Sequence, residues 1–120
     1  MCLTQLSLGG VGLGRRGAEA LAKPLPFLSR LSHLGLGRNA LGEAGLELLL
    51  PALHALMLLR TLGLQHNDLG PSCSTLLAQL IASLGAVEDV LLYGNSLHLG
   101  LHGIRPLEPC RHLITWDTDI

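Results

Sequence analysis

Leucine and valine recur along this chain at a constant interval of about 28 residues, which is a repeat length typical of stacked supersecondary units. Four columns of apolar residues follow the period: Leu3, Leu31, Leu59 and Val87; Leu6, Leu34, Leu62 and Val90; Leu8, Leu36, Leu64 and Leu92; and Leu13, Leu41, Leu69 and Leu97. A unit of this length cannot bury its apolar face alone and must stack on its neighbours. The period therefore predicts a solenoid, whose function resides on a surface rather than in a deep pocket.

Within each unit the apolar spacing changes from alternation to that of a helix. Leu34 and Leu36 alternate as in a strand, whereas Leu46, Leu49 and Leu53 follow helical spacing. The sequence thus predicts an α/β fold in which strands and helices alternate. We expect a single domain over residues 1–120, with repeats at about 3–30, 31–58, 59–86 and 87–112 and a partial fifth strand in 113–120.

Proline and glycine modify the helical half of several units. Pro24 and Pro51 predict helices of about two turns in the first two units, because proline cannot donate a helical hydrogen bond. The third unit has a cleaner helical pattern. The fourth loses this pattern around Gly103 and Pro106. The fifth strand is expected to be short and to place Leu113 in the column of Val87, which makes the last repeat two residues shorter than the period.

An asparagine follows each of three predicted strands. The short amides of Asn39, Asn67 and Asn95 can bond the backbone of a sharply curving chain, so that stacked asparagines form a ladder. Residues 31–45 read LSHLGLGRNALGEAG, which resembles the leucine-rich repeat of the ribonuclease-inhibitor type found in many NOD-like receptors. The resemblance covers about residues 3–97. It implies a horseshoe segment of four to five repeats, with a concave parallel sheet and short outer helices.

The outward strand positions would form the concave surface. Many of them are small, and Leu91 with Tyr93 is the bulky apolar pair among them. Aromatic anchors concentrate binding energy at interfaces, and Gly63 is expected to leave room for a partner side chain beside the tyrosine ring. The predicted protein-binding site comprises Tyr93, Leu91, Gln65, His66, Arg38 and His33.

A second motif suggests a dinucleotide site. Gly12, Gly14 and Gly17 match G-x-G-x-x-G, but the strand that follows, 31–38, has no acidic residue for the ribose hydroxyls. Gly14 and Gly17 also recur as Gly42 and Gly45, so the repeat itself explains them. Dinucleotide binding is only a remote alternative, and we expect no cofactor.

Hydrolytic chemistry finds little support. Ser7, His33 and Thr61 fall on one face, but the nearest acid is Asp89 and an open sheet excludes no water from such a group. We expect the protein not to be an enzyme. Inhibition of a cationic ribonuclease is equally disfavoured, because it would require more acidic residues on the concave face.

Histidine and cysteine gather near the C-terminus in a pattern that invites comparison with a zinc site. His98, His102, Cys110 and His112 could supply ligands, yet Gly100 weakens any helix between the two first histidines and the spacing fits no common finger. We expect no metal.

The sequence as a whole predicts a non-catalytic interaction or regulatory scaffold. The resemblance implies a fragment or relative of a NOD-like-receptor-type innate immune regulator, with another protein as partner. The alternative is a ligand-sensing domain that binds RNA or a small molecule across Arg38, His66 and Tyr93. The formal net charge of −1 makes nucleic acid the less favoured ligand.

Cysteine usage and hydropathy bear on the compartment. Three scattered cysteines form no disulfide framework, and the apolar run 46–59 is interrupted by charged and proline residues and is short for a membrane span. We expect a cytoplasmic protein without membrane insertion. Because strand residues follow Met1 almost at once, the apolar ends of the stack are expected to be uncapped and to permit self-association.

Overall fold

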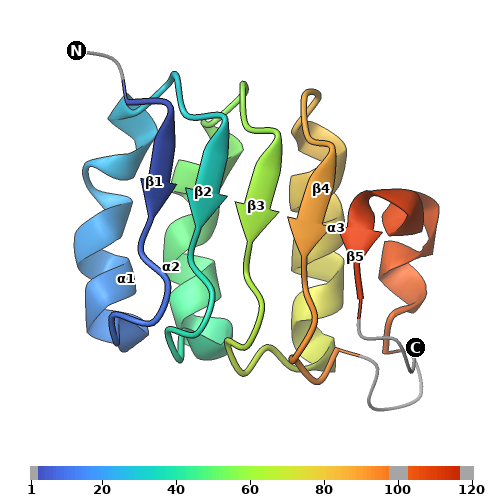
Figure 1. Ribbon diagram of the computed structural model, residues 1–120. Coiled ribbons are helices and arrows are strands. Elements are labelled where there is room, and N and C mark those ends of the chain that lie inside the picture. Colours follow the sequence, from blue (N-terminus) through green and yellow to red (C-terminus); the bar gives the residue numbers. More distant parts are fainter. Residues whose placement is uncertain (1–2, 98–102, 117–120) are drawn as a thin grey trace.

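The computed structural model describes residues 3–97 and 103–116 (Figure 1). Strands and helices alternate along these residues, as the change in apolar spacing predicts. The strands are β1 (Gln5–Ser7), β2 (His33–Gly35), β3 (Thr61–Gly63), β4 (Asp89–Leu91) and β5 (Ile114–Thr115). The α-helices are α1 (Gly14–Ala22), α2 (Gly42–His54) and α3 (Ser74–Ser83), and the 3₁₀ helices are η1 (Leu25–Phe27), η2 (Pro71–Cys73) and η3 (Arg105–Leu113).

The five strands form one parallel sheet in the order β1-β2-β3-β4-β5. Helices α1, α2 and α3 all lie on one side of the sheet, behind it in Figure 1. The helices connect parallel strands, which must start at the same edge and therefore need a crossover. The opposite side has no helix over it in the described parts of the chain, and we call it the open face. An α/β fold with a parallel sheet and helices is thus confirmed.

The register of the sheet follows the spacing of the apolar columns. Leu6 pairs with Leu34, Leu34 with Leu62 and Leu62 with Val90, so each step equals the period of the sequence. The last pair differs, because Val90 pairs with Ile114. A fifth strand with Leu113 in the column of Val87 would instead have paired Val90 with Trp116. The expected register of this strand is therefore wrong by two positions.

The short last unit has a physical cause in its connecting helix. The 3₁₀ helix η3 rises about 2.0 Å per residue, compared with about 1.5 Å in an α-helix, so fewer residues span the layer. The chain becomes extended at Ile114 (φ −110°, ψ 132°), which enters the core. A shift of two positions preserves which side chains point inward.

The core lies between the sheet and the helices. Leu34, Leu36, Leu62 and Leu64 are at most 1% exposed, and helical leucines such as Leu49 cover them. The first unit is less well covered: Leu6, Leu8 and Leu13 are only half-buried, whereas their counterparts in the second unit are buried. The β1 side of the described structure is therefore its least protected end.

Helix α2 is longer than the prediction of about two turns. It extends over 13 residues and includes Pro51, whereas α3, expected to be the cleaner helix, has 10. Pro51 and Glu47 are both exposed, so the carbonyl of Glu47, which Pro51 cannot bond, faces water. This placement on the solvent side lets the helix continue through the proline.

The C-terminal described segment covers the other end of the stack. Helix η3 lies beside α3, and Leu107 and Ile114 are 1% and 8% exposed within the common core (Figure 1). The expectation of an uncapped end is therefore wrong here. Nowhere in 3–97 or 103–116 is there a helix long and apolar enough to cross a membrane.

Candidate functional site

The predicted asparagine ladder is present. Asn67 Oδ1 accepts hydrogen bonds from the backbone N–H groups of Asn39 (2.9 Å) and Leu41 (3.3 Å), and its Nδ2 donates to Leu36 O (2.8 Å). Asn95 and Asn39 repeat this arrangement one unit later and one unit earlier. Each asparagine thus closes the turn of the unit before its own, and these residues serve the architecture rather than a ligand.

The turns beyond the strands contain residues with left-handed backbone. Arg38 (φ 59°) and His66 (φ 53°) occupy positions that Gly10 and Gly94 occupy in the first and fourth units, also at positive φ. Side chains with a Cβ are disfavoured in this conformation. Residues Ala40 and Asp68 form a second such column. Nothing in the apolar pattern of the sequence indicates this feature.

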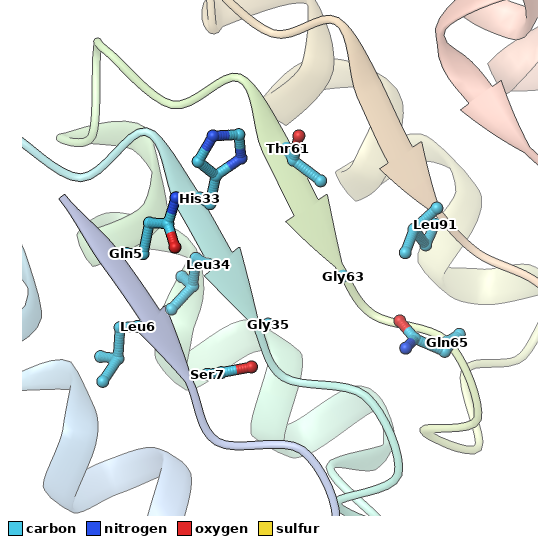
Figure 2. A pocket seen from close by; sticks show the side chains of 10 residues that line it. All are labelled: Gln5, Leu6, Ser7, His33, Leu34, Gly35, Thr61, Gly63, Gln65 and Leu91. Atoms are coloured by element: carbon cyan, nitrogen blue, oxygen red, sulfur yellow. The ribbon is translucent and has the colours of Figure 1, made fainter.

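A shallow groove of about 280 Å³ lies on the open face (Figure 2). Gly35 and Gly63, which pair in register, leave its floor without side chains, and Leu91 stands on the adjacent strand. The residues that line it are Gln5, Leu6, Ser7, His33, Leu34, Gly35, Thr61, Gly63, Gln65 and Leu91. The sequence-predicted residues Leu91, Gln65 and His33 therefore meet in one site.

Gln65 partly fills the groove. Its amide lies over two glycines, since a Cβ added to Gly37 would fall 2.4 Å from Nε2 and one added to Gly63 would fall 3.0 Å from Oε1. Gln65 Oε1 is buried and has no hydrogen-bond partner among the described residues. An unpaired buried acceptor of this kind costs about 1–3 kcal/mol. Gln65 therefore takes up part of the space expected beside Gly63, which still lines the groove.

The remaining predicted residues lie outside the groove, beyond the ends of the strands. Tyr93 packs edge-on against His66, with ring centroids 5.3 Å apart at 87°. Gly94 also accommodates the His66 ring, because an added Cβ would overlap it. Arg38 is exposed. The predicted site thus divides into a groove group around Leu91 and a turn group of Arg38, His66 and Tyr93.

A second hollow, of about 350 Å³, lies where the strands begin. Thr4, Arg30, Ser32, His33, Leu58, Arg60 and Ala86 line it. His33 also lines the groove, so the two hollows adjoin. Alternation within the strands did not reveal this group, because most of its members precede the strands. The sequence feature that could have revealed the group is that Thr4, Ser32 and Arg60 recur at the repeat interval, which places them side by side in the stack.

The polar side chains of the open face have few partners. Thr115 Oγ1 donates a 2.6 Å hydrogen bond to Asp89 Oδ1. His33 lies in register with Gln5 and Thr61, while Ser7 lies in register with Gly35. The histidine and Ser7 thus occupy different rows of the sheet. What this face offers chemically is apolar contact and hydrogen bonding.

The sequence also suggested His98, His102, Cys110 and His112 as possible metal ligands. His98 and His102 lie outside the described residues, and the part of the chain that is described contains no group of three or more metal-binding side chains. Cys110 is half-buried, and burial raises the pKa of its thiol. Burial, followed by the nearby charge of Glu43, likewise raises the pKa of Cys73.

The glycines of the dinucleotide-like motif belong to the turn before α1 and to the first turns of that helix. Gly12 and Gly14 have φ of 70° and 58°, and Gly17 lies inside the helix against the side chain of Leu13.

No protein-family model matches the chain, and no curated protein matches it.

Proposed function

We propose that this protein is a non-catalytic, cytoplasmic interaction module of the leucine-rich-repeat class, a solenoid with repeats of the ribonuclease-inhibitor type, that binds another protein on its open face. The groove carries this proposal. It combines a glycine floor at Gly35 with an apolar side chain at Leu91, and the Gln65 amide lies beside them with its buried Oε1 unpaired. A partner chain could cover the first two, and rotation of the Gln65 side chain would bring its amide to the partner's backbone.

The constant register supports the repeat assignment. The paired strands β1 to β4 advance by one period at each step, and the asparagine bonds span 26 to 31 residues between units. The pattern of residues 31–45 adds the relation to NOD-like-receptor-type regulators as part of the same proposal. Cys73 and Cys110 are free thiols, which suits a reducing compartment.

The experiment is a selection of peptides from a random display library against the immobilised protein. Affinities of the selected peptides are then measured by fluorescence anisotropy for the parent protein and for Leu91→Ser. We expect Leu91→Ser to weaken binding about tenfold, because truncating an apolar contact in an interface centre typically costs more than about 1 kcal/mol.

The matched control is Phe27→Ser. Phe27 is 84% exposed on η1, away from the groove, and its replacement removes an apolar side chain that a partner could equally reach. Binding that is lost in Phe27→Ser and retained in Leu91→Ser would place the interaction surface elsewhere. Thermal unfolding of both variants shows whether either change acts through stability instead.

A further inference from the structure

The hollow at the strand starts, which we call the basic rim, joins two arginines to two hydroxyl groups. Successive backbone bonds align its members: Ser32 N–H donates to Thr4 O at 2.8 Å, and Arg60 N–H donates to Ser32 O at 2.7 Å. Ser32 Oγ also donates to Thr4 O at 3.2 Å. The rim therefore crosses the segments that lead into three neighbouring strands, β1, β2 and β3, at one level.

The arginines of the basic rim are weakly engaged. Arg60 makes a single ion pair with Glu88, at 3.9 Å, in which the side chains are 62% and 69% exposed. An exposed pair at this distance contributes little, and its geometry leaves the guanidinium free to exchange partners. Arg30 has no ion pair within the two described ranges. The rim thus holds more cationic charge than its surroundings neutralise.

We propose that the basic rim binds a carboxylate of the partner protein, while an apolar side chain next to that carboxylate lies in the groove. This inference rests on the proposed function and specifies the partner as an acidic-apolar peptide segment. Guanidinium groups match carboxylates in charge and in planar geometry. His33 borders both hollows, so one short segment can reach the rim and the groove together.

An acidic peptide fits better than a nucleic acid. Nucleic-acid surfaces combine a stripe of cations with aromatic side chains on which bases stack. No aromatic ring lines the rim or the groove among the described residues, apart from the imidazole of His33. Tyr93 packs against His66 in the turn group.

The test uses the same display selection on the parent protein, followed by measurements on charge variants. We expect the selected peptides to carry Asp or Glu within a few residues of an apolar side chain. Arg30→Gln with Arg60→Gln should weaken their binding about fivefold, a value that allows for the exposure of both arginines. Glu88→Gln should strengthen peptide binding, because this change releases Arg60 from its ion pair and removes a negative charge that would repel the carboxylate of the peptide.

The control is Arg15→Gln with Arg16→Gln, which removes the same charge from exposed positions on α1. If both double variants weakened peptide binding equally, the net charge of the protein alone would explain the loss, and the inference would be overturned. Peptides that are neutral and depend on Leu91 alone would also overturn it, while leaving the proposed function intact. Peptides that depend on neither the groove nor the rim would overturn both.

A competition experiment distinguishes binding of an acidic peptide from binding of nucleic acid. Oligo(U) RNA is added as competitor at several salt concentrations. We expect no displacement of the peptide at physiological salt. Strong displacement that disappears in the Arg30 and Arg60 variant and falls steeply with salt would assign the basic rim to RNA and overturn the peptide inference.

Discussion

At the scale of single residues, the turns beyond the strands hold non-glycine residues in the left-handed conformation. Arg38, Ala40, His66 and Asp68 all have φ between 51° and 59°. Such values cost an ordinary residue about 1–2 kcal/mol. The stack imposes them, because the neighbouring turns bond to one another through the asparagine ladder. The first unit avoids the cost by having glycine at both positions.

Replacing Ala40 by glycine should therefore stabilise the protein. Ala40 is exposed, so the change sacrifices no packing. Relief of the left-handed strain outweighs the added freedom of glycine in the unfolded chain, and we expect a gain of about 0.5–1 kcal/mol. Urea denaturation measures it. The control, Ala20→Gly within α1, should lose about 0.5–1 kcal/mol. A loss in both variants would show that the turn carries no strain.

The ladder asparagines should differ in their contribution to stability. The bonds that Asn67 Oδ1 accepts are buried, whereas those that Asn39 Oδ1 accepts from Val11 and Leu13 are only partly buried. We expect Asn67→Ala to cost about 1–3 kcal/mol and Asn39→Ala to cost less, since water can replace some of its bonds. Equal denaturation midpoints for the two variants would contradict this ranking.

At the scale of elements, the sequence predicted the strands more accurately than the connections between them. Leucines repeated at a constant interval specify which residues enter the core, and this set the register of β1 to β4 in advance. The length of α2 depends on Pro51 facing water, which periodicity alone does not show. The start of β5 depends on where η3 ends, and Ile114 and Trp116, two positions apart, are both apolar residues that could pair with Val90.

Helix η3 should contribute to stability as a core element. Leu107 is 1% exposed, and we expect Leu107→Ala to lower the free energy of unfolding by about 2–4 kcal/mol, the usual cost of a leucine-sized cavity. Glu108→Ala is the control, because Glu108 makes only an exposed pair with Arg111 at 3.3 Å. If the leucine variant were as stable as the control, η3 would not be docked on α3 in solution.

At the scale of the whole molecule, the open face was predictable in outline and the site on it was not. Alternation along the strands identified the outward columns, including the groove residues Leu91 and His33. The position of the Gln65 amide depends on bare neighbouring glycines, and the basic rim depends on side chains from segments before three strands. Such features arise only when units are stacked, and no single unit contains them.

The two ends of the stack should differ in their tendency to associate. Leu3 is 41% and Val11 58% exposed at the β1 end, whereas η3 and β5 cover the other end. We expect the protein to self-associate with rising concentration in sedimentation equilibrium, and Leu3→Lys with Val11→Lys to restore a monomer. Association that persists in this double variant, or a monomer in the parent protein, would contradict a role for the β1 end.

The asparagine bonds also have a direction. The side chain of Asn39 bonds to the backbone of Val11 and Leu13, and Asn67 in turn to that of Asn39 and Leu41, so each turn depends on a residue 26 or 28 positions later. On the ribosome the chain emerges from its N-terminus. The first turn therefore stays incomplete until Asn39 has left the exit tunnel, and the turns at Asn39 and Asn67 wait in the same way for Asn67 and Asn95.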